Sequence, residues 1–154
     1  MVYSYPFPFR QSQSVSIISH MHQGDIYTEL LCSYWTQILV VASFQSPYIS
    51  TFESALFHFT YARTGARGSL QRYIQGNQSR AIKLTLIHCL VMSQRYLTVL
   101  KETLPKVQTE ASSPFSNPLK KIELLLNQIE PHLQQTISLA KNMLGEDEWE
   151  HSIP

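Results

Sequence analysis

Apolar residues recur at spacings of three and four along four stretches of the chain, which is the pattern of amphipathic helices. The first predicted helix starts after Gly24 with Asp25 as its N-cap and ends near Phe44, before Pro47. Its periodic apolar positions are Ile26, Leu30, Tyr34, Ile38, Val41 and Ala42. We expect residues 1–24 to form an extended arm rich in aromatic residues and proline.

A capping box predicts the start of a second helix. Ser50 and Glu53 have the spacing at which a hydroxyl and a carboxylate each satisfy one unpaired backbone N–H. The apolar face that follows consists of Phe52, Leu56 and Phe59. Because Gly65 and Gly68 weaken a helix, we expect this helix to end near Arg63 and a short helical insert to follow.

A third helix is predicted after Ser79, whose hydroxyl can act as the N-cap. It runs from Arg80 to Leu104 and ends before Pro105. Projection at 100° per residue gathers its apolar side chains into one arc. The core positions predicted in this way are Ile82, Leu86, Cys89, Leu90, Leu97, Leu100 and Leu104.

Asn117 and Pro118 supply an N-cap and a first-turn proline for a fourth helix, and Gly145 marks its end. Pro131 lies inside this segment, so we expect a kink or a break near Glu130. The positions predicted to face the core are Leu119, Ile122, Leu126, Ile129, Leu133, Ile137, Ala140 and Leu144.

These elements predict an all-α fold. We expect a single bundle of four main helices, spanning residues 25–145, with a short helical insert that carries arginine and glycine. The arm of residues 1–24 precedes the bundle, and an acidic tail, residues 146–154, follows it. No segment alternates strictly enough to predict a strand.

Charge is scarce and unevenly distributed. Charged residues make up 15% of the chain, against a usual value of about 25%. Residues 61–106 hold eight basic residues and one carboxylate, whereas residues 107–154 hold three basic residues and seven carboxylates. No acidic residue lies between Glu53 and Glu102. Blocks of one sign indicate a polyanionic partner or an acidic protein surface.

No catalytic motif is present, so we expect neither an enzyme nor a cofactor. His20, His22 and Asp25 are too few to complete a metal site by spacing, and we expect no bound metal. Cys32 and Cys89 are interpreted as reduced core thiols. Without a signal peptide or an apolar stretch of about 18 residues, we expect a cytoplasmic protein without membrane contact.

Residues 60–80, called here the Arg/Gly segment, give the strongest functional signal. Guanidinium groups form bidentate contacts with phosphates, and tyrosines can stack on unpaired bases. The basic residues of the third predicted helix share one face that continues this segment. The predicted nucleic-acid-binding residues are Arg63, Arg67, Arg72, Tyr73, Arg80, Lys83, Arg95 and Lys101. The alternative interpretation is that these arginines are solvated or pair with the acidic tail.

In size, helical pattern, lack of a catalytic motif and single basic face, residues 25–145 resemble the small helical subunit of CRISPR effector ribonucleoproteins. The resemblance is strongest to the bundle at the end of the large subunit in type I-D systems. It implies contacts with DNA through backbone phosphates, and partners that include other subunits and further copies of this chain. It transfers no functional residue by motif.

A second class of function stays open. The same arginines could dock an acidic protein surface, with the aromatic arm as the anchor, in an adaptor or assembly factor. Low surface charge suits both functions. Protein that purifies with bound nucleic acid would favour the first, and protein that purifies without it would favour the second.

Overall fold

The computed structural model describes residues 6–41, 47–111 and 113–153, and over these ranges the chain is helical without any strand. The main helices are α1 (Pro6–Val41), α2 (Pro47–Ile74), α3 (Arg80–Glu110) and α4 (Ser116–Leu144). A short 3₁₀ helix, η2 (Ser113–Phe115), precedes α4, and a short helix, α5 (Glu146–Ser152), follows it. The predicted all-α class with four main helices is therefore confirmed.

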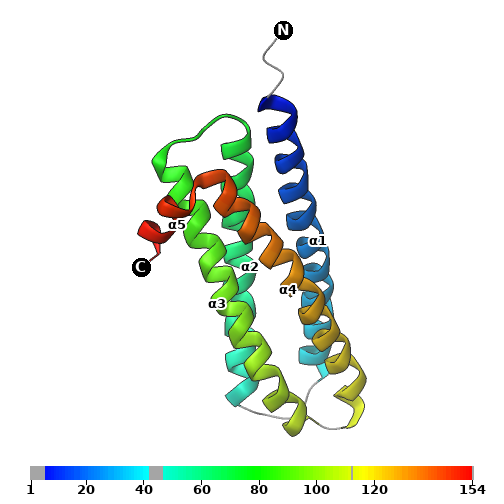
Figure 1. Ribbon diagram of the computed structural model, residues 1–154. Helices are drawn as coiled ribbons and strands as arrows, with labels where there is room; N and C mark the ends of the chain where they lie inside the picture. Colours follow the sequence, from blue (N-terminus) through cyan, green and yellow to red (C-terminus); the bar gives the residue numbers. More distant parts are fainter. Residues whose placement is uncertain (1–5, 42–46, 112, 154) are drawn as a thin grey trace.

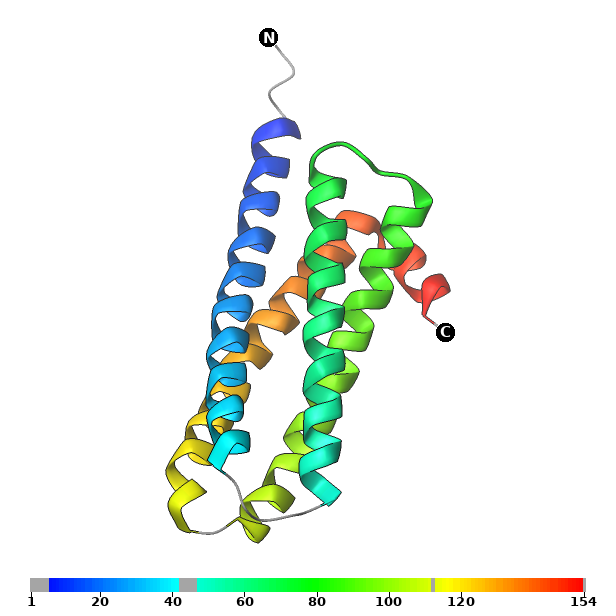
Figure 2. The same ribbon diagram turned by 180° about the vertical axis from the view of Figure 1, so that it is seen from behind.

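The four long helices pack as two antiparallel pairs. α2 packs most closely on α3, and α1 packs most closely on α4, whereas α1 and α2 make few backbone contacts. In Figure 1 and Figure 2, α4 starts beside α1 and crosses the bundle toward α3, where α5 also lies. The core is therefore formed where the two pairs face each other.

The core of α4 agrees fully with the predicted periodicity. Its buried residues include every predicted position: Leu119, Ile122, Leu126, Ile129, Leu133, Ile137, Ala140 and Leu144. On α3, Leu86, Leu90, Leu97, Leu100 and Leu104 are also buried as predicted, while Ile82 and Cys89 are half-buried. On α2, the predicted face of Phe52, Leu56 and Phe59 is buried.

The prediction for α1 was wrong in extent. Residues from Pro6 onward are helical instead of forming an extended arm. Pro6 and Pro8 fall in the first turn, where the missing N–H would have had no helical partner. Residues 1–5 of the predicted arm, and the predicted end near Phe44, lie outside the described residues.

The predicted buried face of α1 is confirmed at Ile38 and wrong in its first half. Ile26 and Leu30 are 37% and 45% exposed. The buried positions follow a regular alternation of three and four: Ile17, Met21, Gly24, Thr28, Leu31, Trp35 and Ile38. Gly24 and Thr28 interrupt the apolar pattern of this stripe, which is why hydrophobicity alone selected a different face.

The predicted end of α2 near Arg63, and the separate helical insert, were wrong. The helix continues through Gly65 and Gly68 to Ile74, so most of the Arg/Gly segment is a regular part of α2. At Gly65 a Cβ atom would lie 2.7 Å from Cys89 Sγ on α3. We infer that the close approach of α2 and α3 offsets the usual cost of about 1 kcal/mol for a helical glycine.

Other helix boundaries give mixed outcomes. Ser79 caps α3 as predicted, since its Oγ accepts a hydrogen bond from the Ile82 N–H at 3.4 Å. Ser50 is not the N-cap of α2, because that helix already begins at Pro47. The predicted N-cap at Asn117 is displaced as well, since α4 begins at Ser116.

Two prolines lie inside helices that continue past them. α3 passes Pro105 and ends at Glu110, and α4 passes Pro131 without a break. A proline costs about 3 kcal/mol in a helix interior. Burial of side chains beyond Pro105, such as the fully buried Val107, offsets that cost.

The end of α4 at Leu144 was predicted correctly, and Gly145 terminates it with a φ of 93° that favours glycine. The acidic residues that follow do not form a wholly solvated tail. They form α5, whose Trp149 is 4% exposed and lies 5.5 Å from Lys141 Nζ, measured to the indole ring centroid. Packing of this tryptophan against the bundle fixes the position of α5.

We expect the clash in Gly65→Ala to cancel the gain in helix propensity and to lower the free energy of unfolding by up to about 1 kcal/mol, because Cys89 must rotate or α2 and α3 must separate. Gly68→Ala is the matched control. A Cβ at Gly68 meets no atom within 4 Å, so helix propensity should raise stability by up to about 1 kcal/mol. Denaturant unfolding measures both, and equal effects would contradict the close approach at Gly65.

Candidate nucleic-acid interface

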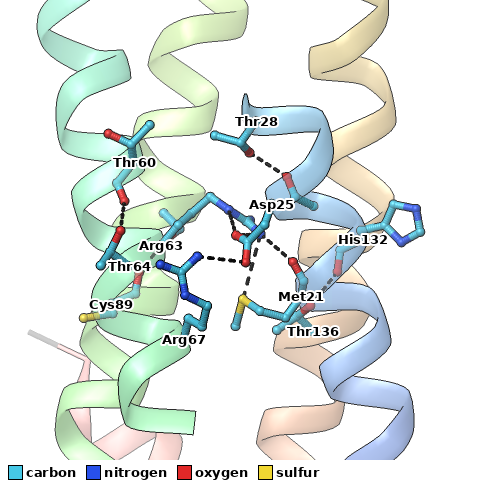
Figure 3. A network of polar contacts seen from close by, with 12 residues as sticks. Met21, Asp25, Thr28, Thr60, Arg63, Thr64, Arg67, Cys89, His132 and Thr136 are labelled. Atoms are coloured by element: carbon cyan, nitrogen blue, oxygen red, sulfur yellow. Dashed lines mark hydrogen bonds and ion pairs between the residues drawn. The ribbon is translucent and has the colours of Figure 1, made fainter. Parts of the chain in front are cut away.

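Arg63 does not lie on the surface as a phosphate contact would require. Its side chain is 4% exposed and reaches from α2 to α1, where Asp25 is 15% exposed. Its Nε and Nη2 atoms donate to Asp25 Oδ1 at 3.1 and 2.9 Å, and Nη2 also donates to the Met21 carbonyl at 3.1 Å (Figure 3). We therefore remove Arg63 from the predicted binding residues.

Gly24 makes room for this buried guanidinium. A Cβ at Gly24 would lie 2.5 Å from Arg63 Nη2, so a larger residue would displace the arginine. The Gly24 carbonyl accepts a hydrogen bond of 2.6 Å from Thr28 Oγ1. Burial lowers the pKa of Arg63 and the charge of Asp25 opposes that shift. Arginine stays protonated in proteins, so a charged pair joins α1 to α2.

Three further predicted residues are partly engaged within the bundle. Arg67 is 46% exposed, and its Nη1 lies 3.1 Å from Asp25 Oδ2. Lys101 Nζ on α3 lies 2.8 Å from a Glu130 carboxylate oxygen on α4. Tyr73 is half-buried and its hydroxyl donates to the Met143 carbonyl at 3.4 Å. Each is therefore less available to a ligand than its residue type suggests.

The remaining predicted residues keep their charges available. Arg72, Arg80 and Arg95 are exposed, and Lys83 is half-buried. Within the described part of the chain, none of the four forms an ion pair with a carboxylate. They lie on α2 and α3.

An aromatic ladder that the sequence did not reveal joins these two helices. Phe57 on α2 is 65% exposed and meets the ring of His58 edge-on, with centroids 5.5 Å apart. His58 in turn stacks on Tyr96 of α3 at 5.1 Å. Tyr61, one turn beyond Phe57, is 74% exposed. The sequence did place Phe57 and Tyr61 opposite the buried face of α2, but it held no signal for the contact between His58 and Tyr96.

The described residues contain no cluster of three or more potential metal ligands from histidine, cysteine, aspartate and glutamate. Asp25, which the sequence placed near His20 and His22, pairs with Arg63 and Arg67. His20 lies instead against His132 of α4, which spacing along the chain could not suggest.

Cys32 and Cys89 are half-buried free thiols. Burial raises the pKa of both groups, and Glu29 adds to the effect at Cys32. A raised pKa keeps a thiol protonated and poorly nucleophilic. Neither cysteine therefore resembles a catalytic nucleophile.

Comparisons with known proteins find no significant match, whether to a family model, to a curated protein or to a solved structure. Among the described helices, none combines the length and the apolar character that crossing a membrane requires. The assignment of function therefore depends on the chemistry of the surface itself.

Asp25→Ala should lower the free energy of unfolding by about 3 kcal/mol, because it leaves the buried Arg63 without its carboxylate. Glu130→Gln is the matched control at a pair that is only half-buried, and it should cost about 0–1 kcal/mol. Arg63→Met should cost less than Asp25→Ala, since it removes the buried charge as well. Urea unfolding measures all three, and similar losses for Asp25→Ala and Glu130→Gln would contradict the structural role of this pair.

Proposed function

We propose that this protein binds the backbone of nucleic acids through basic and aromatic side chains of α2 and α3, without catalysis of its own. The observation that carries the proposal is the combination of arginines lacking carboxylate partners with exposed aromatic rings on the same two helices. The residues concerned are Phe57, His58, Tyr61, Arg72, Arg80, Lys83, Arg95 and Tyr96.

Electrostatics supports a polyanionic ligand. The absence of acidic residues between Glu53 and Glu102 means that no carboxylate from α2 or α3 in that interval offsets the arginines. A guanidinium group can donate two parallel hydrogen bonds to one phosphate, and each neutralised phosphate releases counterions. Backbone contacts of this kind give affinity with little sequence preference.

The aromatic residues support contact with unpaired bases. Phe57 and Tyr61 place large apolar side chains in water, where they gain nothing from the core. Each base has a π-face, so stacking on such rings tolerates any sequence and contributes about 1–3 kcal/mol per base. Charge and stacking together favour a single-stranded segment as ligand.

The setting that we propose is a larger ribonucleoprotein of the CRISPR effector type, in which this chain is a non-catalytic helical subunit. Its support is the resemblance in size and helical make-up described above, together with the basic face. In such an assembly the chain would contact nucleic acid, other subunits and further copies of itself.

A protein-interaction bundle is the second candidate function. The observation that favours it is the exposure of apolar side chains on the outer side of α1, where Val15 is 66% exposed and Ile18 is 47% exposed. In that case the arginines would meet an acidic protein surface. Purification without bound nucleic acid, together with a stable protein partner, would favour this alternative.

The affinity for a single-stranded oligonucleotide should fall with salt, at a log–log slope of about −0.7 per phosphate neutralised. The double variant Arg72→Ala and Arg80→Ala should make the slope shallower by about 0.7 per lost contact. Fluorescence anisotropy across a salt series measures this. Lys120→Ala on α4 is the control and should leave the slope unchanged; an unaltered slope in the arginine variant would oppose the proposal.

Stacking can be tested separately from charge. Tyr61→Ala should weaken binding of a single-stranded oligonucleotide by about 1–3 kcal/mol while changing duplex binding and the salt slope little. Its exposure of 74% means that stability should hardly change, which thermal melting can check. Equal weakening for single strands and duplexes would argue against base stacking at this position.

A further inference from the structure

His20 of α1 and His132 of α4 meet at a single short contact. Their Nδ1 atoms lie 2.9 Å apart and their ring centroids 5.2 Å apart, although 112 positions separate them in sequence. The ring centroid of Tyr27 on α1 lies 5.9 Å from that of His132. Both histidines are half-buried, so solvent protons can reach them.

Two imidazole nitrogens at this distance can share one proton and no more. In the hydrogen-bonded state one Nδ1 donates and the other accepts with its lone pair. If both rings are protonated on both nitrogens, neither Nδ1 can accept, and two positive rings face each other. The contact therefore holds the helices together while at least one of the two rings is neutral.

The surroundings add further positive charge. Arg63 of α2 acts on His132 at longer range, and Asp25 of α1 partly neutralises that arginine through its ion pair. Burial, the charge of His20 and the charge of Arg63 lower the pKa of His132, in that order of importance. Stability from a group with a lowered pKa is present above its ordinary value near 6.5 and is lost as the pH falls below it.

The position of the His20–His132 contact determines which part of α1 would detach if the contact were lost. α4 lies beside α1 near the start of α4 and then crosses toward α3, so the N-terminal half of α1 has less of α4 beside it (Figure 1). α1 makes few backbone contacts with α2. The N-terminal half of α1 consequently depends on few attachments, of which this pair is one.

We propose that the contact between His20 and His132 is a pH-sensitive latch that holds the N-terminal half of α1 on the bundle near neutral pH and releases it when both rings are protonated. Release would affect the helix from Pro6 to His20 first and would expose Ile17, which is fully buried in the closed state. This inference is independent of the proposed nucleic-acid binding.

Amide hydrogen exchange read by mass spectrometry tests the latch in the full chain, in buffer containing EDTA so that no metal ion bridges the imidazoles. After correction for the intrinsic pH dependence of exchange, protection of residues 6–21 should fall about tenfold between pH 7.5 and pH 5.5. Protection of α2, α3 and the second half of α4 should change much less.

His132→Gln tests the cause, because glutamine retains hydrogen-bonding groups near His20 and cannot take up a proton. Protection of residues 6–21 in this variant should be nearly independent of pH. His22→Gln, on the exposed side of the same helix, is the matched control and should behave as the unaltered protein. If His132→Gln does not fold, as thermal melting at pH 7.5 will show, His20→Gln takes its place.

Three results would overturn the latch. Protection of residues 6–21 could be independent of pH in the unaltered protein, or the variant lacking one histidine could keep the full pH dependence. Loss of protection could also spread equally over all helices, which would indicate global acid unfolding.

Discussion

The ion pair between Arg63 and Asp25 is the constraint on which the arrangement of the two helical pairs depends. α1 packs on α4 and α2 packs on α3, whereas α1 and α2 make few backbone contacts, so the long arginine side chain spans the space between them. A buried charge is tolerated only where its partner and hydrogen-bond acceptors are in place. Gly24 provides the space, and Asp25 and the Met21 carbonyl provide the acceptors. One register of α1 against α2 satisfies all three requirements.

This pair also changes what the basic block of the sequence means. A count of charges treats each arginine as a surface group. In the structure, Arg63 is buried in an ion pair with Asp25, and Arg67 pairs with the same carboxylate. Lys101 joins α3 to α4 through Glu130. The acidic residues that partner these cations come from α1 and α4, which the charge asymmetry along the chain had placed in separate blocks. Packing therefore brings carboxylates of α1 and α4 beside part of the basic block and neutralises part of its charge.

The sequence-based predictions were accurate where the buried stripe of a helix is apolar throughout, and inaccurate where other helices decide which residues are buried. α4 was predicted closely, because its buried stripe is apolar at every turn and its end is marked by Gly145. α1 was predicted poorly, because Gly24 and Thr28 occupy two inward positions: Gly24 leaves room for Arg63 of α2, and the Thr28 hydroxyl donates to the Gly24 carbonyl within α1. Pro105 and Pro131 failed to end their helices because the burial of neighbouring side chains outweighs the local cost. The aromatic ladder and the His20–His132 contact depend on tertiary pairing, which no local pattern specifies.

The candidate site could have been narrowed from the sequence if α2 had been recognised as continuous. At 100° per residue, Arg67 lies 40° from Arg63 and Arg72 lies 180° from it. The exposure of the side chains follows this order, from 4% at Arg63 through 46% at Arg67 to the exposed Arg72. Gly65 and Gly68 predicted a break in the helix between these arginines. With a break, the angles of Arg63 and Arg72 could not be compared around one helix axis. A single helix therefore carries an arginine that holds the fold together and, on its opposite side, one that is available to a ligand.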